Sequence, residues 1–237
     1  FYGPSTLRKG IEYSRNLMTI RIAQYLGMEK ISEIANRSGI MNNMPNVLLM
    51  ALGAGETSLI DLTSAYASFV NGGKKISPSL IDRIQDRRGK NIYLANFSKC
   101  NNCSEPYIEE NPRPNLININ QKIFDEAKSY QMVSILKGAV DRGTGRKTRI
   151  NGIEIAGKTG TTNNNTDAWF VGFTSELIIG VYAGFDKPES LGKRETGSSV
   201  AVPIFRDFVT KYYSEKSILP FTIPNGIELI KINYDTG

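Results

Sequence analysis

Three strand-like segments lie close together around residue 170, and they constrain the fold more than any other feature of this 237-residue sequence. They span 153–162, 168–173 and 177–185, and short loops or turns connect them. Parallel neighbours would need crossovers of about a dozen residues or more, so these segments are predicted to pair antiparallel. The second half of the chain should therefore contain an antiparallel sheet.

Helical patterns precede and follow this predicted sheet. Apolar residues at 17, 18, 20, 22, 23 and 26 mark one face of a helix, and Gly27 is expected to end it. The same kind of reasoning predicts further helical segments at 6–12, 32–38, 61–70, 125–140 and 201–213. The hydrophobic content of 40% is enough to fill an ordinary core. The predicted fold class is α+β, with an antiparallel sheet packed between helices.

Two regions depart from this plan. Residues 80–85 and 91–94 flank the turn sequence at 86–89, a pattern typical of a hairpin. Residues 96–120 contain both cysteines and three prolines, and they are expected to form an irregular surface insertion. One domain is therefore predicted over 1–213. Residues 214–237 are predicted to be a linker that leads into a strand at 227–233, the start of a truncated C-terminal segment.

Histidine is absent from the sequence. This excludes a Ser-His-Asp triad, a Cys-His pair and a histidine-ligated zinc site within the chain. A serine nucleophile would consequently need a lysine or a carboxylate as its base.

The charge balance is basic, with 29 Lys and Arg against 23 Asp and Glu. Such a balance suits an anionic setting such as a cell envelope or nucleic acid, but the basic residues are scattered and favour a solvated surface. No stretch reaches the roughly 18 consecutive apolar residues of a membrane-spanning helix, and the first residues do not resemble a signal peptide. Any membrane anchor is expected in upstream sequence.

Cys100 and Cys103 form a single CxxC pair. A four-cysteine zinc site would need a second pair, and a thioredoxin-like role would need a βαβ setting. A local disulfide is the favoured interpretation, with free thiols and a redox or intersubunit metal role as alternatives. No cofactor and no metal site within the chain are predicted.

The segment 152–159 satisfies the phosphate-binding pattern GxxxxGK[ST]. A P-loop needs a flexible turn followed by a helix, whereas residues 153–156 alternate like a strand and a polar loop follows. The segment is therefore interpreted as a strand. On that strand Lys158 and Gly160 share a face, and the bare glycine leaves room for a ligand beside the lysine.

A cation beside an open strand suits the carboxylate of an extended peptide, which free strand amides could also bind. A surface lysine in a glycine-bordered hairpin is the alternative. The second candidate is Ser14-Arg-Asn16, just before the helix that begins near Leu17. Serine and asparagine commonly cap helices, so a cap without catalytic duty is one interpretation. The other is a turn that projects both side chains into one cleft.

Together, Ser14-Arg-Asn16 and Lys158-Thr-Gly160 resemble two of the three motifs of penicillin-binding proteins and serine β-lactamases. They lie 144 residues apart, a spacing similar to that of such transpeptidases. Further segments resemble the bifunctional, class A synthases more specifically: Leu7-Arg8, Ala51–Glu56, Leu62–Tyr66 with Asn71–Gly73, Arg142–Thr144, Ala156–Thr162 and Asp167–Phe173. The likeness extends over nearly the whole chain and is poorest at 96–120.

This resemblance implies a serine β-lactamase-like fold and the activity of a peptidoglycan DD-transpeptidase. In that reaction a serine attacks the D-Ala-D-Ala bond of a stem peptide and passes the acyl group to a neighbouring amine, and β-lactams acylate the same serine. The implied partners are stem peptides, β-lactams and other cell-wall synthesis proteins, with no nucleic acid. The implied location is the extracytoplasmic, periplasmic face of the bacterial cytoplasmic membrane.

The resemblance also implies the site residues. Ser14 would relay a proton to the departing amine, Asn16 would hold the substrate amide, and Lys158 would supply positive potential. The implied substrate-binding residues are Thr159, Gly160 and Thr161, with the Thr161 amide as one oxyanion donor.

The nucleophile of that family is the serine of a Ser-x-x-Lys motif upstream of Ser-x-Asn. Here the segment at 5–8 has arginine in the lysine position, and arginine does not readily deprotonate. Residues 134–137 and 190–193 match the motif by letter, but the first lies on a helix before the Lys-Thr-Gly strand and the second in a loop. The chain is therefore expected to lack the nucleophile, to be incomplete at its N-terminus and to be inactive alone. A serine β-lactamase-type hydrolase and a non-catalytic binding or assembly module are the alternatives.

Overall fold

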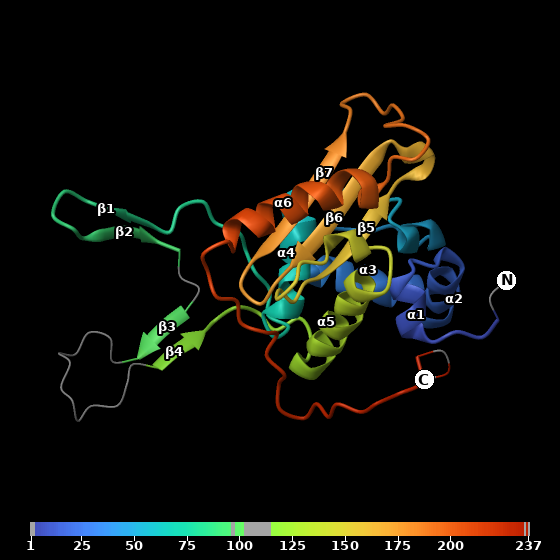
Figure 1. Cartoon of the computed structure of the whole chain (residues 1–237). Helices are drawn as coiled ribbons and strands as arrows, with labels where there is room; N and C mark the ends of the chain where they lie inside the picture. The colour runs from blue at the N-terminus through green and yellow to red at the C-terminus, as the bar shows by residue number, and fades with distance from the viewer. Residues whose placement is uncertain (1–2, 96–97, 102–114, 235, 237) are drawn as a thin grey trace.

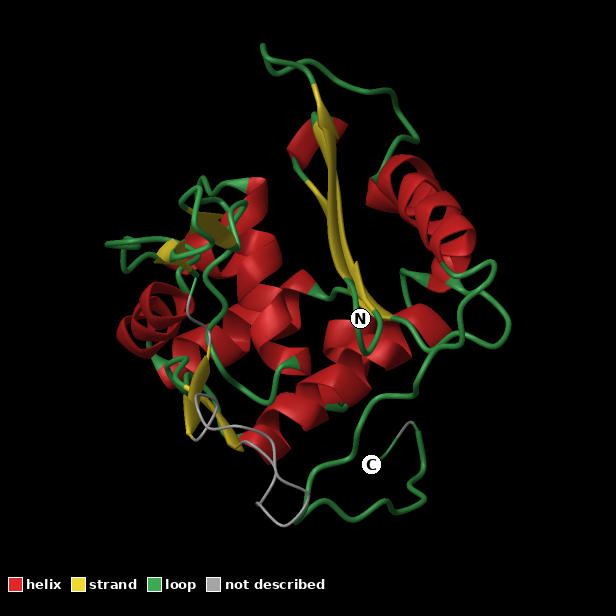
Figure 2. Cartoon of the chain, turned by 90° about the vertical axis from the view of Figure 1, so that its left-hand side faces the viewer, coloured by secondary structure: helices red, strands yellow, loops and turns green. Residues whose placement is uncertain are grey.

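An antiparallel sheet between two layers of helices lies at the centre of the protein (Figure 1). The computed structural model describes residues 3–95, 98–101, 115–234 and 236. The sheet has the order β5-β6-β7 and consists of β5 (Ala156–Thr161), β6 (Asp167–Phe173) and β7 (Ile178–Gly184). Figure 2 shows it edge-on, with α6 (Val202–Tyr212) on one side and the other long helices opposite. The predicted α+β class and antiparallel pairing are confirmed.

The helices begin and end at residues that suit those positions. Thr6, Ser58 and Asp125 accept backbone hydrogen bonds as the N-caps of their helices. The helices of the second layer are α1 (Leu7–Glu12), α2 (Asn16–Leu26), α3 (Met28–Ser38), α4 (Leu59–Val70) and α5 (Glu126–Asp141). No helix in the described part of the chain has both the length and the apolar character needed to cross a bilayer.

Helix α3 begins earlier than the sequence predicts. Gly27 ends α2 and also precedes the first residue of α3, with a φ of 84° that favours glycine. The two helices therefore meet at a single residue, and the prediction that the second starts at residue 32 is wrong. Short helical turns complete the elements: η1 (Leu48–Leu52), η2 (Arg146–Thr148), η3 (Asn163–Asn165) and the π-helical turn η4 (Gly197–Ala201).

The two faces of the sheet pack against different helices. Phe170 is fully buried on one face and meets Phe205 of α6 edge to face, with ring centroids 4.9 Å apart. Phe173 lies on the opposite face, in a hydrophobic cluster that includes residues of α5. Its ring centroid is 5.8 Å from that of Phe221. Residues two apart on a strand share a face, so Val171 of β6 lies on the same face as Phe173. Lys158 of β5 pairs with Val171 and therefore also lies on this second face.

The predicted hairpin is confirmed, and a second strand pair follows it in the described part of the chain. Strands β1 (Arg83–Gln85) and β2 (Asn91–Leu94) pair antiparallel. Strands β3 (Ser98–Asn101) and β4 (Asn115–Asn118) also pair, so the expectation of irregular structure over 96–120 is wrong for these eight residues. Backbone groups form the ladder, and a polar, asparagine-rich composition does not prevent it. Cys103 lies outside the described residues, which leaves the disulfide prediction untested.

The C-terminal tail returns across the molecule from α6 to α1 (Figure 1). Phe221 anchors it in the core, where its backbone amide donates to a Glu154 carboxylate oxygen at 3.0 Å. The strand predicted at 227–233 is wrong, because these residues pair with no strand of the described chain and Leu229, Ile230 and Ile232 are exposed. A strand is stable only beside a partner edge. The domain boundary at 213 stays a prediction.

Candidate active site

Ser14 lies in the turn between α1 and α2. Its φ of 53° places it in the left-handed region, which non-glycine residues rarely adopt. Arg15 is the residue that precedes α2 as its N-cap, and it makes no side-chain cap bond. The helix-cap interpretation of the motif is therefore wrong. Ser14 is exposed in the turn, and Asn16 is the exposed first residue of α2.

Strand β5 is an edge strand. It pairs with β6 on one side, and no described strand lies on its other side. The amide of Thr162 donates to the carbonyl of Asp167 at 3.2 Å, and the direction of amides alternates along an antiparallel strand. The amides of Thr159 and Thr161 consequently point toward the open edge. Because β5 begins at Ala156 and no helix starts at Lys158, the pattern at 152–159 does not form a P-loop here.

Lys158 and Ser14 meet although they are 144 residues apart in the chain. The ammonium Nζ donates to Ser14 Oγ at 2.7 Å and to the Thr159 carbonyl at 2.9 Å. Burial lowers the pKa of Lys158 from 10.5 to about 8. The lysine can therefore hold or release a proton near neutral pH, directly beside a hydroxyl.

Two further contacts hold β5 in place. The hydroxyls of Thr144 and Thr159 are hydrogen-bonded at 2.7 Å, and the amide of Gly197 donates to Thr161 Oγ1 at 3.0 Å. A Cβ on Gly197 would lie 2.5 Å from the carbonyl oxygen of Gly160, so only glycine allows this approach. Sequence reasoning assigned no role to Thr144 or Gly197. Their signals were the Arg142–Thr144 tripeptide and an isolated glycine after a polar loop.

The two alternative Ser-x-x-Lys matches have other partners. Ser134 Oγ accepts from Arg8 at 3.2 Å. Lys137 pairs instead with Asp141 at 3.5 Å and with Glu154 at 3.4 Å. In the loop match, Ser190 Oγ accepts from the amide of Gly192 at 3.2 Å. In the first match both the serine and the lysine thus contact other groups, and in the second match the serine does.

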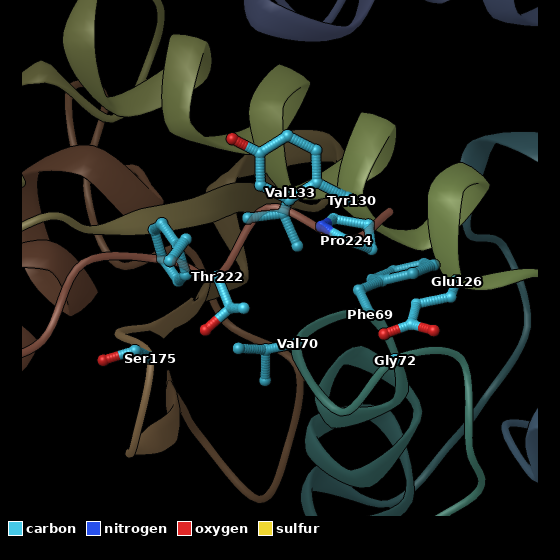
Figure 3. A pocket seen from close by; sticks show the side chains of 10 residues that line it. Phe69, Val70, Gly72, Glu126, Tyr130, Val133, Ser175, Thr222 and Pro224 are labelled. Atoms are coloured by element: carbon cyan, nitrogen blue, oxygen red, sulfur yellow. The ribbon is translucent and has the colours of Figure 1, made fainter. Parts of the chain in front are cut away.

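A pocket lies away from this site, between the end of α4, the first half of α5 and the tail (Figure 3). Phe69, Tyr130 and Phe221 line it together with the carboxylate of Glu126. None of the site residues implied by the resemblance lines it. Within the described ranges, no cluster of three or more acidic or cysteine side chains is arranged to hold a metal ion.

The lowered pKa of Lys158 predicts a pH-dependent stability. Between pH 8 and 10.5 the unfolded chain binds more protons at this group than the folded chain, so its contribution to the free energy of unfolding rises with pH. Replacing Lys158 with methionine removes this contribution. Urea denaturation should show that the variant has a higher free energy of unfolding than the wild-type chain, with the larger difference at about pH 7 and the smaller at about pH 10. A difference that stays constant between the two would contradict the lowered pKa.

An open sheet edge with a serine–lysine contact beside it is the arrangement expected of a serine acyltransferase with Ser-x-Asn and Lys-Thr-Gly motifs. The family model described as the penicillin binding protein transpeptidase domain matches residues 1–210. The chain therefore belongs to the penicillin-binding protein transpeptidase domain family.

Named relatives agree with this assignment. Penicillin-binding protein 1A of Rickettsia prowazekii is 44% identical over 243 residues, which cover 100% of this chain and 30% of the relative. That of Pseudomonas aeruginosa is 32% identical, with 100% of this chain and 33% of the relative covered. The chain thus spans about a third of the length of these relatives.

Solved structures show the same fold. Penicillin-binding protein 1A from Haemophilus influenzae superposes with a TM-score of 0.78 at 28% identity, covering 94% of this chain and 36% of that one. The PonA1 protein of Mycobacterium tuberculosis, solved in complex with penicillin V, gives a TM-score of 0.75 at 20% identity, with 94% and 60% covered. The predicted serine β-lactamase and transpeptidase-like fold is confirmed.

Proposed function

We propose that the protein to which this chain belongs is a peptidoglycan DD-transpeptidase, and that these 237 residues form the part of its site that carries Ser14, Asn16 and the Lys-Thr-Gly strand. The observation that carries the proposal is the 2.7 Å contact between Lys158 Nζ and Ser14 Oγ. It joins two motifs that the chain keeps far apart in sequence. Membership of the transpeptidase family supports the same reaction.

The geometry suits a proton relay during acyl transfer. The Ser14 hydroxyl can pass a proton to the departing amine while Lys158 stabilises the charge that develops beside it. Asn16, exposed at the start of α2, is proposed to hold the substrate amide. The open edge of β5 supports a role in binding, because an extended stem peptide can pair with it.

The terminal carboxylate of the donor peptide is proposed to lie against Thr159 and Thr161. Gly160 adds no side chain at this point of the strand, where a Cβ would already lie 3.1 Å from Trp169 Cβ. The amide of Thr161 points toward the open edge and is proposed as one oxyanion donor. The amide of the nucleophilic serine would be the other.

We propose that the nucleophilic serine and its motif lysine lie outside these 237 residues. The contacts of Ser134 and Lys137 support this, because each has partners that leave no serine–lysine pair. Large apolar side chains on α2 and η1 also support it. Leu17, Tyr25 and Leu49 are 54%, 89% and 60% exposed, as expected of a surface that another segment covers.

The proposed ligands are stem peptides and β-lactams, and the proposed location is the extracytoplasmic face of the bacterial cytoplasmic membrane. The penicillin V complex of the Mycobacterium tuberculosis protein supports β-lactam binding. A serine β-lactamase is not favoured, because the relatives over the whole chain are penicillin-binding proteins. A non-catalytic assembly role for the isolated chain follows only if it binds other cell-wall synthesis proteins.

A fluorescent penicillin separates these functions. The full-length protein is expected to form a stable adduct at a serine upstream of Phe1, because transpeptidases deacylate slowly. The isolated 237-residue chain is expected to stay unlabelled. Gel fluorescence and peptide mass spectrometry measure both results. Rapid turnover of the label by the full-length protein would support the β-lactamase instead, and stable labelling at Ser134 or Ser190 would contradict the proposed position of the nucleophile.

A further inference from the structure

Glu12, the last residue of α1, is a completely buried acidic side chain beside the site, with 0% of its surface exposed. Arg142 donates to it through Nε at 3.2 Å and also through Nη2. Tyr234 of the tail donates its hydroxyl at 2.8 Å, and Arg8 Nη1 lies 3.8 Å away. A buried charge is stable only with such partners. The carboxylate therefore joins α1, the residue after α5 and the tail.

The backbone of Glu12 connects the same place to β5. Its carbonyl oxygen accepts from the amide of Thr144 at 3.1 Å. The hydroxyl of Thr144 in turn contacts that of Thr159, next to Lys158. Ser14 follows Glu12 by two residues. Glu12 is thus connected to Ser14 through the chain and to the residue beside Lys158 through hydrogen bonds.

Two glycines make room for Glu12. A Cβ on Gly138 of α5 would lie 1.9 Å from Glu12 Oε1, and one on Gly143 would lie 2.0 Å from the Glu12 carbonyl oxygen. Any other residue at position 143 would clash with the backbone at the end of α1, and one at position 138 would displace the Glu12 carboxylate. The close approach is therefore a specific feature of this packing.

We propose that Glu12 is a positioning residue, whose ion pair with Arg142 fixes the end of α1 on the end of α5 and so holds Ser14 against Lys158. The inference rests on the proposed function of that site and adds a residue that touches no reacting atom. Tyr234 contacts the Glu12 carboxylate from the tail, and the Arg142 guanidinium lies 5.1 Å from the centroid of the Tyr234 ring. The hydrogen bond to Glu12 raises the pKa of Arg142. The position of the tail consequently bears on the site as well.

The test uses the 237-residue chain itself and measures the pH dependence of Lys158 acetylation by acetic anhydride, with the Lys158 peptide quantified by mass spectrometry. The wild-type chain should show a midpoint near 8. In Glu12→Gln the ion pair is lost, the turn at Ser14 moves and water reaches the amine. The midpoint should then rise by about 1 pH unit or more toward that of an ordinary lysine.

Two variants make the test specific. Tyr234→Phe removes one donor but keeps the carboxylate, so a smaller rise is expected. Glu33→Gln breaks the exposed Glu33–Arg37 pair on α3 and should leave the midpoint unchanged. Circular dichroism establishes that each variant is folded. If Glu12→Gln does not fold, Tyr234→Phe decides, and an unchanged midpoint there overturns the proposal.

The outcomes separate this inference from the proposed function. A folded Glu12→Gln chain with the wild-type midpoint would refute the positioning role and leave the serine–lysine site intact. An equal rise in Glu33→Gln would also refute it, since any lost charge pair would then suffice. A wild-type midpoint like that of an exposed lysine would instead count against the site and its proposed function.

Discussion

Replacing Ser14 with alanine in the full-length protein is expected to slow acylation by penicillin roughly 10²- to 10⁴-fold, the usual loss when a positioned proton-transfer group is removed. The variant keeps Lys158 but removes the hydroxyl that lies 2.7 Å from its ammonium. The departing amine then has no relay for its proton. The second-order rate constant for labelling by a fluorescent penicillin, measured under pseudo-first-order conditions, gives the effect directly.

Ser190→Ala is the matched control for this prediction. Its hydroxyl accepts a bond from the amide of Gly192 in a loop, so its loss should leave the rate nearly unchanged. Thermal melting of both variants shows whether folding is preserved. A folded Ser14→Ala protein that is acylated at the wild-type rate would exclude the proton relay.

Phe205→Ala is expected to lower the free energy of unfolding of the chain by about 3–5 kcal/mol. The ring is completely buried between α6 and the sheet, where it meets Phe170. Its removal leaves a cavity that the rigid strand beneath cannot fill, because Gly172 contributes no side chain there. Urea denaturation at neutral pH measures the change.

Phe208→Ala on the same helix provides the comparison. This side chain is 51% exposed and stacks only on Tyr212 in the ring contacts of the described chain, so a loss below about 1 kcal/mol is expected. Equal losses for the two variants would mean that α6 does not pack on the sheet through the face seen here.

The spacing of apolar residues and the residues that begin or end helices predict most of the fold. The three strands and the helices on either side follow from apolar spacing and from residues such as Gly27 and Asp125 at their ends. The failures occur where a partner decides the structure. Strands β3 and β4 form because their backbones pair with each other, whereas the apolar residues at 227–233 pair with no strand of the described chain.

The candidate site was predictable where short motifs carry the chemistry. Ser14 and Lys158 are recognisable from their sequence motifs, and the structure brings them together. Their roles in catalysis stay predictions. The Arg142–Thr144 tripeptide was a sequence signal for Thr144, but Glu12 was not predictable as a site residue. It is an ordinary helix glutamate in sequence, and its importance appears only once Gly138 and Arg142 are brought against it.

The left-handed backbone at Ser14 has a consequence for which amino acids this position can accept. Threonine offers the same hydroxyl, yet its branched Cβ is strongly disfavoured at a φ of 53°. Glycine and asparagine tolerate the conformation but carry no hydroxyl. Chain geometry and proton chemistry are thus satisfied together by serine, which narrows the substitutions open to evolution at this point more tightly than the chemistry alone would.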